Sequence, residues 1–275
     1  MGTYVHIHVD WHLPGEWLGT PGFVVAERQR PHQGPAAEVW QGNIIACLAI
    51  GATITPCAWV RVAAVDKQAG IDEVEAMFAS ILARLDTSIT EIAWFLTDYW
   101  PLQWLERLGF VPASDVISFV KRDLSVPAFD CPSELEIRPI LMEELSALEA
   151  IEGAAFEPRW RHSAEDLFLA WRQSIVFEVA LLKGRPVAFQ LSTGGDGEAH
   201  VSRITVHPSY QGLGIGAALL ASAMKAYGRQ NIRTVTLNTQ ADNLPSRRLY
   251  ERFGFRATGQ SYQVWSYPVP SNDSD

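Results

Sequence analysis

A seven-residue pattern occurs twice in the chain, and this repeat limits the folds that the sequence can adopt. Residues 104–110 read WLERLGF and residues 249–255 read LYERFGF. Each pattern is preceded by a segment typical of a β-strand, followed by one typical of a helix. In the first half the strand segment is residues 58–65 and the helix segment is residues 71–85. In the second half the corresponding strand spans residues 199–206. Similar elements in the same order indicate an internal duplication, so we expect two related domains in one chain.

Strands and helices alternate through the second half of the chain. The expected strands span residues 135–138, 175–183, 185–192, 199–206, 234–238 and 260–266. The expected helices span residues 141–151, 162–174, the segment from the glycines to about 227, and 243–253. Because hairpins lie at both ends of this series, the sequence predicts an α+β fold in which mixed, mostly antiparallel sheets are flanked by helices.

The domain boundary is expected in a proline-containing stretch. Residues 124–134 read LSVPAFDCPSE and interrupt every periodic pattern, which is typical of a linker. The first domain would then span residues 1–123 and the second residues 135–267. Residues 268–275 end in small polar side chains without an apolar anchor, so we expect a mobile tail.

The composition excludes several classes of protein. Hydrophobic residues make up 48% of the 275 residues and charged residues 19%, as in ordinary globular domains. The net charge of -9 disfavours a nucleic-acid partner, because phosphate backbones are bound through clusters of Lys and Arg. Residues 44–60 are uncharged, but Gly51 and Pro56 break the run, so we expect two buried strands and no membrane span. The three cysteines have no metal-ligand spacing and the N-terminus no signal-peptide pattern, so we expect reduced thiols, no metal and a cytoplasmic location.

Three glycines, Gly212, Gly214 and Gly216, lie between an expected strand and an expected helix. Without side chains there, backbone N–H groups can converge on an anion, and the helix dipole adds to the attraction. A phosphorylated ligand therefore fits the segment, while a turn needed only for tight packing gives the same letters. Residues 212–217 (GLGIGA) also satisfy the dinucleotide pattern G-x-G-x-x-G/A, but the turn is long and the acidic residue expected further on is missing. A Walker loop is excluded, because no Gly-Lys-Ser/Thr follows the glycines.

Two motifs resemble those of one enzyme family. Residues 206–216 (VHPSYQGLGIG) resemble the Q/R-x-x-G-x-G/A signature of the GNAT superfamily of N-acetyltransferases. Residues 237–255 (LNTQADNLPSRRLYERFGF) are similar to the closing motif of the same superfamily. The resemblance covers about residues 135–267, and residues 1–123 only as a degenerate copy. It implies two tandem GNAT-like domains, with acetyl-coenzyme A (acetyl-CoA) as the cosubstrate of the second.

The resemblance also implies roles for individual residues. The backbone of Ile204, Thr205 and Val206 would pair with the pantetheine amides of acetyl-CoA, and the glycine loop would receive its pyrophosphate. Tyr250 would give a proton to the leaving thiolate, since a phenol with an ordinary pKa of about 10 is protonated at neutral pH. The implied cofactor-binding residues are Ile204, Thr205, Val206, Gln211, Gly212, Leu213, Gly214, Ile215, Gly216, Ala217, Asn238, Asn243 and Ser246.

The residue that removes a proton from the amine is less well defined. Glu198, His200 and Ser202 alternate along one strand, so they would share a face, and Glu198 and His200 are the candidate bases. A polar strand face without a catalytic duty has the same pattern. In the ribosomal-protein branch of the superfamily a carboxylate often occupies the fifth strand, where this chain has Asn238, which disfavours that branch.

The first half departs from the family pattern. Residues 67–70 (KQAG) offer no glycine cradle, and Leu105 stands where the second half has Tyr250. We expect a supporting domain that neither binds acetyl-CoA in the usual way nor performs chemistry.

Two other features of the first half are candidates for function. Polar residues alternate with apolar ones near the N-terminus, and the polar row consists of His6, His8, Asp10 and His12. Such a row could bind a metal. We expect it instead to be the outward polar face of an edge strand. Seven of the ten tryptophans lie in this half, either in the core or around an acceptor pocket: Trp11, Trp17, Trp40, Trp59, Trp94, Trp100 and Trp104.

The leading hypothesis is a tandem acetyltransferase. Its second domain would move an acetyl group from acetyl-CoA to a primary amine of a small molecule or peptide, with a homodimer as one assembly. A non-catalytic CoA-binding or interaction protein of the same fold is the alternative. Aminoacyl transfer from charged tRNA fits the architecture but not the acidic charge.

Overall fold

The computed structural model describes residues 3–29 and 42–270 of the chain. Trp40 and residues 271–275, for which the sequence suggested a core or pocket role and a mobile tail, lie outside the described residues. Within the described ranges, no helix is both long enough and apolar enough to cross a membrane.

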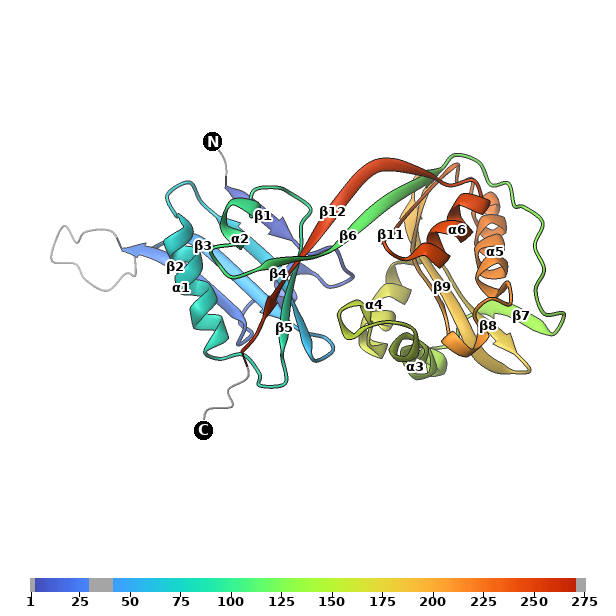
Figure 1. Ribbon diagram of the computed structural model, residues 1–275, viewed down its shortest axis with the longest axis horizontal. Coiled ribbons are helices and arrows are strands. Elements are labelled where there is room, and N and C mark those ends of the chain that lie inside the picture. Colours follow the sequence, from blue (N-terminus) through green and yellow to red (C-terminus); the bar gives the residue numbers. More distant parts are fainter. Residues whose placement is uncertain (1–2, 30–41, 271–275) are drawn as a thin grey trace. The chain divides into compact units, whose positions relative to one another are not determined.

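The chain forms two compact units (Figure 1). The first unit comprises Met1–Ala113 and Gln263–Asp275, and the second comprises Ser114–Tyr262. Two long strands, β6 (Val111–Lys121) and β12 (Arg256–Pro268), carry the chain between the units. The division therefore differs from one at a linker between consecutive domains, because each of these strands begins in one unit and ends in the other.

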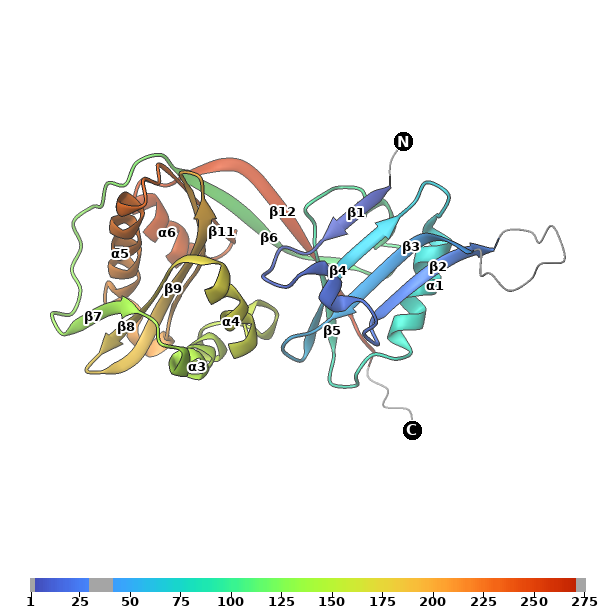
Figure 2. The same cartoon turned by 180° about the vertical axis from the view of Figure 1, so that it is seen from behind.

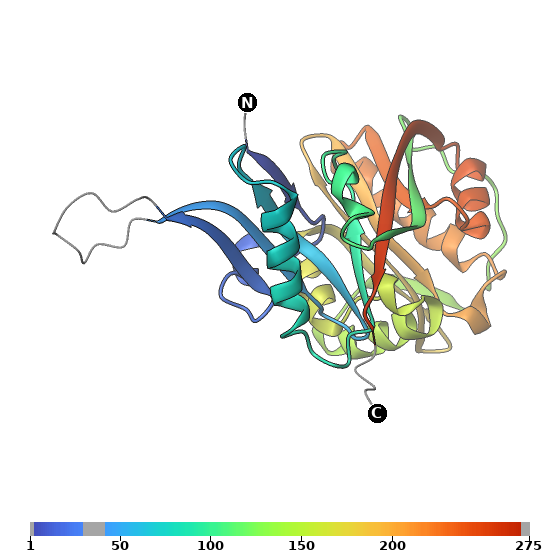
Figure 3. The same cartoon turned by 60° about the vertical axis from the view of Figure 1, so that its left-hand side comes forward.

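The first unit is a sheet with a helix on one face. Its strands are β1 (Tyr4–Ile7), β2 (Phe23–Gln29), β3 (Gly42–Gly51), β4 (Cys57–Val65) and β5 (Glu91–Phe95). The last residues of β12, Val264–Pro268, pair antiparallel with β5 and complete this sheet. Helix α1 (Ile71–Leu82) packs on β2 and β3 (Figure 3). The shorter helices are η1 (Pro14–Trp17) and α2 (Leu102–Leu105).

Helix α1 follows from its sequence pattern. Val74, Met77, Phe78 and Ile81 recur at helical spacing and are all buried. The carboxylate of Glu73 accepts a hydrogen bond from the backbone N–H of Gly70 at 2.7 Å, so the start of the helix is capped by its own side chain.

Strand β4 has two different neighbours along one of its edges. Residues Cys57–Trp59 pair in parallel with Glu91–Ala93 of β5. Beyond them, Val62–Val65 pair antiparallel with Tyr4–Ile7 of β1. Strands β4 and β5 therefore separate after Trp59, and the N-terminal strand takes the place that β5 leaves.

The orientation of β1 is the reverse of the one expected from its sequence. His6 is 1% exposed, whereas Val5 and Ile7 are 46% and 48% exposed. The expectation of an outward polar face is wrong, because the His6 face of β1 packs on the core and the Val5 and Ile7 face is the exposed one. His6 lies opposite Ala63 of β4 and packs near Trp94, at 5.6 Å between ring centroids, within the aromatic core below α1.

The second unit is a sheet covered by helices on both faces (Figures 1 and 2). Its strand order is β6-β11-β10-β9-β8-β7, and all neighbours are antiparallel except β10 and β11. Helix α5 (Ile215–Arg229) packs on β8, β9 and β10, and α3 (Leu145–Ala155) packs on β9 and β10. The remaining elements are β7 (Leu135–Pro139), η2 (Met142–Glu144), η3 (Pro158–Trp160), α4 (Ala164–Gln173), β8 (Ser174–Leu182), β9 (Arg185–Gly195), β10 (Glu198–Val206), η4 (Pro208–Tyr210), β11 (Thr234–Gln240) and α6 (Leu244–Arg252).

Candidate active site

Strand β10 loses one of its neighbours halfway along. Residues Glu198–Val201 pair in parallel with Thr234–Leu237 of β11. The pairing with β9 has an irregularity between Val201 and Arg203, and from Arg203 to Val206 only β9 remains as a partner. Within the described residues, no strand pairs with the other edge of this segment. Backbone hydrogen-bonding groups of a strand need partners, so this edge suits an extended ligand with amide groups.

The glycine loop joins the open end of β10 to helix α5. Gly212 and Gly214 have φ of 77° and 78°, a left-handed conformation that favours glycine, and Gly214 is the N-cap of α5. A Cβ on Gly214 would lie 1.9 Å from the carbonyl oxygen of Asp130, so the linker also requires this glycine. The first turn of α5 carries no acidic side chain. Its N–H groups and dipole can therefore attract an anion.

A cavity of about 670 Å³ opens beside the loop and lies entirely within the second unit. One part of its lining comes from β10, the loop and α6, and includes Ile204, Val206, Gly212, Gly214, Ile215, Gly216, Ala217, Asn243, Ser246 and Tyr250. Another part comes from the end of α3 and the segment after it, and includes Ala155, Phe156, Glu157 and Trp160. Gln211 lines the cavity as well, so the structure brings eleven of the residues expected at the site to one cavity.

Tyr250 sits on α6 with its side chain 7% exposed. The ring packs against Phe119 and Phe255, with centroid separations of 6.3 and 5.9 Å. Burial raises the pKa of the Tyr250 hydroxyl to about 12, although a hydrogen bond with the side chain of Ser246 lowers it. The phenol is therefore protonated at neutral pH and has a proton to give. Asn243 begins the helix, because its side chain accepts a hydrogen bond from the N–H of Ser246 at 3.2 Å.

Some expected cofactor residues have other partners. The side-chain amide of Gln211 donates to the carbonyl oxygen of Val206 at 3.0 Å, so it fixes the loop against the strand. Thr205 is 1% exposed and its hydroxyl donates to Glu152 of α3. Asn238 accepts a hydrogen bond from Ser118 at 2.7 Å, and it is not among the described residues that line the cavity. Leu213 is 47% exposed on the loop.

The two candidate bases do not reach the cavity. His200 lies in the paired half of β10, where its Nδ1 is 2.9 Å from the hydroxyl of Thr236. Burial lowers the pKa of His200, which keeps the ring neutral at neutral pH. Glu198 is exposed at the start of the strand. Neither residue is among the described residues that line the cavity, so their role as bases stays a prediction.

An ion pair that the sequence analysis missed lies behind the cavity wall. Arg203 of β10 contacts Glu152 of α3 through two nitrogens, and Glu152 is 0% exposed. The signal was in the sequence: Glu152 continues the buried stripe of Leu145 and Leu148 at helical spacing, where an apolar residue is the rule. A carboxylate at such a position requires a buried partner.

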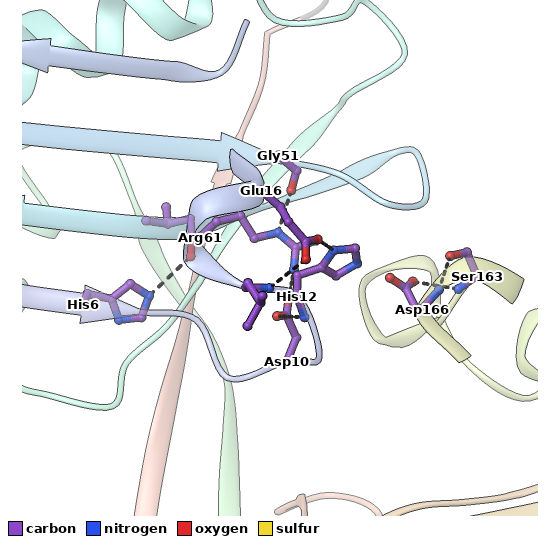
Figure 4. Close-up of polar contacts among 10 residues, drawn as sticks. His6, Asp10, His12, Glu16, Gly51, Arg61, Ser163 and Asp166 are labelled. Carbon is purple, nitrogen blue, oxygen red and sulfur yellow. Dashed lines mark hydrogen bonds and ion pairs between the residues drawn. The ribbon is translucent and has the colours of Figure 1, made fainter. Parts of the chain in front are cut away.

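The polar row near the N-terminus forms ion pairs (Figure 4). Asp10 binds the guanidinium of Arg61, and Nδ1 of His12 is 2.8 Å from the carboxylate of Glu16. His8 packs on the ring of Trp59 at 4.8 Å. Over residues 3–29 and 42–270, no three His, Cys, Asp or Glu side chains are grouped so that they could hold a metal ion.

Comparison with known sequences identifies relatives of this chain. The profile of the Acetyltransferase (GNAT) family matches residues 145–255. A mycothiol acetyltransferase of Brachybacterium faecium is 26% identical over 200 residues, which cover 71% of this chain but only 58% of the relative. An uncharacterized N-acetyltransferase of Methanocaldococcus jannaschii is 32% identical over 121 residues, which cover 44% of this chain and 77% of the relative.

Comparison with solved structures confirms the expected fold class. A GCN5-related N-acetyltransferase of Sphaerobacter thermophilus matches with a TM-score of 0.61 at 20% identity, covering 85% of this chain and 80% of its own. A tandem GNAT protein from the clavulanic acid biosynthesis pathway matches with a TM-score of 0.56 at 15% identity, covering 95% and 87%. These structural similarities show the fold, and the sequence relatives show the family. The chain belongs to the GNAT family of acetyltransferases.

Proposed function

We propose that the second unit transfers an acetyl group from acetyl-CoA to a primary amine. The observation that carries the proposal is the unpaired edge of β10, which runs into a glycine loop at the start of α5 and shares a cavity with a buried, protonated tyrosine. A ligand with amides along an arm and a diphosphate at its end matches both parts of this surface. The free helix start and the open strand edge thus fit the pantetheine diphosphate of coenzyme A.

Backbone groups would hold most of the cosubstrate. Ile204, Thr205 and Val206 would pair with the pantetheine amides, and the N–H groups of residues 212–217 would receive the diphosphate. Asn243 and Ser246 also line the cavity and would contact the same arm. When bound, acetyl-CoA supplies an acetyl group already activated as a thioester.

The chain's own residues then orient the reaction and supply a proton. Phe156 and Trp160 line the cavity and would shield the reacting groups from water. Tyr250 gives its proton to the departing sulfur and recovers one from solvent. Glu198 and His200 stay predicted bases for the incoming amine, and an amine that arrives neutral needs neither.

The acceptor is a small-molecule or peptide amine. Relatives include mycothiol acetyltransferases, a spore coat polysaccharide biosynthesis protein of Bacillus subtilis and a putative ribosomal-protein-alanine N-acetyltransferase of the same organism. These names point to mycothiol, to polysaccharide biosynthesis and to a ribosomal-protein alanine, so they favour neither kind of acceptor. The three cysteines of the chain are free thiols, which suits the reducing cytoplasm that we propose as its location.

Calorimetry and a thiol-release assay test the proposal together. We expect acetyl-CoA to bind and a thiol-reactive dye to report CoA release with at least one amine from a panel of polyamines, aminoglycosides, amino acids and peptides. Binding without turnover on a broad panel would favour a non-catalytic CoA-binding protein. Binding of a nicotinamide dinucleotide in place of acetyl-CoA would contradict the proposal. Sedimentation of the same samples counts the chains per particle and tests the homodimer.

A further inference from the structure

The buried ion pair of the second unit joins helix α3 to the strand that carries the open edge. Arg203 Nε donates to Glu152 Oε1 at 3.0 Å, and an Nη of the same guanidinium donates to Glu152 Oε2. The hydroxyl of Thr205 donates to Glu152 as well. Both carboxylate oxygens are therefore satisfied at a side chain that has no contact with water.

Such a pair is not needed for stability alone. Taking two charges out of water costs several kcal/mol per ion, and apolar residues of similar volume often replace a buried pair without loss. The sequence has a carboxylate where the stripe of α3 would place a leucine, which points to a positioning role for the pair.

The guanidinium of Arg203 holds the cavity wall. Its central carbon lies 3.7 Å from the ring centroid of Phe156, and an Nη donates to the backbone carbonyl of Trp160. Phe156 and Trp160 both line the cavity. Arg203 also directly precedes Ile204, the first residue of the open edge that lines the cavity. One side chain thus fixes the wall and the strand edge to each other.

The charge of Arg203 also acts on Tyr250. It lowers the pKa of the Tyr250 hydroxyl, against the larger effect of burial. A positive charge stabilises a phenolate, so this guanidinium favours the state that Tyr250 reaches after it has given up its proton.

We propose that Arg203, held by Glu152, is the positioning residue for proton donation by Tyr250. It fixes the cavity wall at Phe156 and Trp160, which line the same cavity as Tyr250. This inference rests on the proposed function and extends it to two residues that the family motifs do not contain.

The reaction that Arg203 assists moves the acetyl group from sulfur to nitrogen. A bond forms between the acceptor nitrogen and the acetyl carbon, and the carbon–sulfur bond breaks with its electron pair on sulfur. Sulfur takes the proton of Tyr250, the nitrogen loses one proton to solvent, and the phenolate is reprotonated from solvent. Negative charge passes through sulfur and then the phenol oxygen, inside the cavity whose wall Arg203 holds in place.

A mutant cycle with Tyr250→Phe tests the coupling. The double variant Glu152→Gln with Arg203→Gln removes both charges, leaves neither ion unpaired and keeps polar groups for Thr205 and Trp160. We expect kcat to fall about thirtyfold while the Kd for CoA, measured by calorimetry, changes less than about threefold. In the Tyr250→Phe background the same double variant should lower kcat less than about threefold, because the proton it assists is gone.

Two further variants separate charge from shape. Arg203→Lys keeps the charge but not the planar fork, and we expect it to retain kcat within about fivefold of wild type. The matched control Arg138→Gln with Glu144→Gln removes a partly exposed ion pair of the same unit, with an Nη–Oε distance of 2.7 Å, and should leave kcat unchanged. Amide hydrogen exchange of residues 156–160 should rise in the Glu152→Gln/Arg203→Gln protein and not in the control.

The outcomes that overturn the inference are distinct from failure of the proposed function. An equal loss of kcat in the wild-type and Tyr250→Phe backgrounds would show that the pair only supports the fold. A double variant with wild-type kcat and unchanged exchange would show that it positions nothing. Tyr250→Phe alone with wild-type kcat would instead remove the proton donor from the proposed function, and failure to bind CoA in wild type would remove its site.

Discussion

The two units build the same strand–helix junction, and only one of them leaves it open. In the first unit β4 pairs with β5 at Cys57–Trp59 and then with β1 at Val62–Val65. In the second unit β10 pairs with β11 at Glu198–Val201, and its next residues have no partner on that side among the described residues. If Val65 corresponds to Val206, as the repeat indicates, β1 occupies the place that we assign to the pantetheine arm.

The N-termini of helices α1 and α5 also differ: the first is occupied by the protein's own residues and the second is open. Helix α1 carries Asp72 and Glu73 in its first turn, and Glu73 binds the N–H of Gly70. Helix α5 has no acidic residue there and begins at Gly214 in the left-handed conformation. The anion position of the first unit is thus filled by its own carboxylate, and that of the second unit is free.

A duplicated ligand site can thus be lost while its fold is kept. A strand edge inside a protein needs hydrogen-bonding partners, and a helix start attracts negative charge. The second unit leaves both needs to a ligand. The first meets them with residues 4–7 and with Glu73, so we expect one acetyl-CoA per chain, bound by the second unit.

The largest expected effect comes from giving α5 the acidic start of α1. Gly216 is the second residue of α5, as Asp72 is of α1, and a Cβ there meets only side chains, at 3.4 Å or more. We expect Gly216→Asp to fold and to weaken acetyl-CoA binding at least about a hundredfold, because its carboxylate repels the diphosphate. Calorimetry should give one site per chain in wild type and none in the variant.

The matched control lies on the same helix. Gly228→Asp places the same side chain near the end of α5, where a Cβ comes no closer than 3.7 Å to Leu124. Its Kd for acetyl-CoA should equal that of wild type. Two sites per chain in wild type, or a site that survives Gly216→Asp, would show that the first unit binds the cosubstrate after all. A Gly214 variant cannot serve, since a side chain there collides with Asp130.

The second effect concerns the stability of the first unit. Burial lowers the pKa of His6 on β1 from 6.5 to about 4, and its Nδ1 has no hydrogen-bond partner among the described residues. Between these values the unfolded chain binds more protons, so stability present above pH 6.5 is lost as pH falls toward 4. From pH 7 to pH 5 the loss should be about 2 kcal/mol.

Chemical denaturation at both pH values, with His6→Gln beside wild type, measures this loss. Gln keeps a side-chain N–H that can reach the carbonyl of Val60, which His6 Nε2 approaches at 3.3 Å. The variant should lose about 2 kcal/mol less than wild type between the two pH values. A slope that does not depend on His6 would mean that β1 does not remain seated against β4 in solution.

Local patterns in the sequence predicted the open junction well. The strand expected at 199–206 is β10, Glu198–Val206, and the helix expected from the glycines to about 227 is α5, Ile215–Arg229. A glycine turn and a 3.6-residue period of apolar side chains each depend on residues that are close together in the chain. Both can therefore be recognised in a single sequence.

The features that the sequence did not predict depend on distant pairing. No local sequence pattern indicates that Tyr4–Ile7 pair with Val62–Val65. This pairing turns the side chain of His6 toward the core. His200 lies in the half of β10 that pairs with β11, whereas Ile204 lies beyond the irregularity after Val201 and lines the cavity. Both the pairing and the irregularity depend on neighbouring strands that are distant in the sequence. A period of two assigns residues to faces but does not tell which face is buried.

A third effect tests the proton donor, which the first unit lacks. Tyr250→Phe removes only the hydroxyl, and we expect kcat to fall about tenfold or more with the Kd for acetyl-CoA unchanged. Tyr227→Phe is the matched control: Tyr227 is 0% exposed in the core of the second unit and its hydroxyl bonds Ser192. It should lower the unfolding free energy by about 1 kcal/mol and leave kcat alone. Equal kcat values for Tyr250→Phe and wild type would contradict the donor role.

The smallest expected effect comes from fixing β1 in place. Ile7 and Val62 are directly opposed across β1 and β4, and Ile7 is 48% exposed, so Ile7→Cys with Val62→Cys can be oxidised to a disulfide. The other neighbour of Val62 is Ala49, which keeps the new thiols out of register with Cys47. If β1 stays paired with β4, the oxidised and reduced forms of the double-cysteine variant should each bind one acetyl-CoA per chain. Their kcat/KM values should then differ by less than about twofold. A tenfold difference, or a second acetyl-CoA that binds only to the reduced form, would instead show that β1 leaves the edge of β4 during turnover and that the first unit is a gated site rather than a filled one.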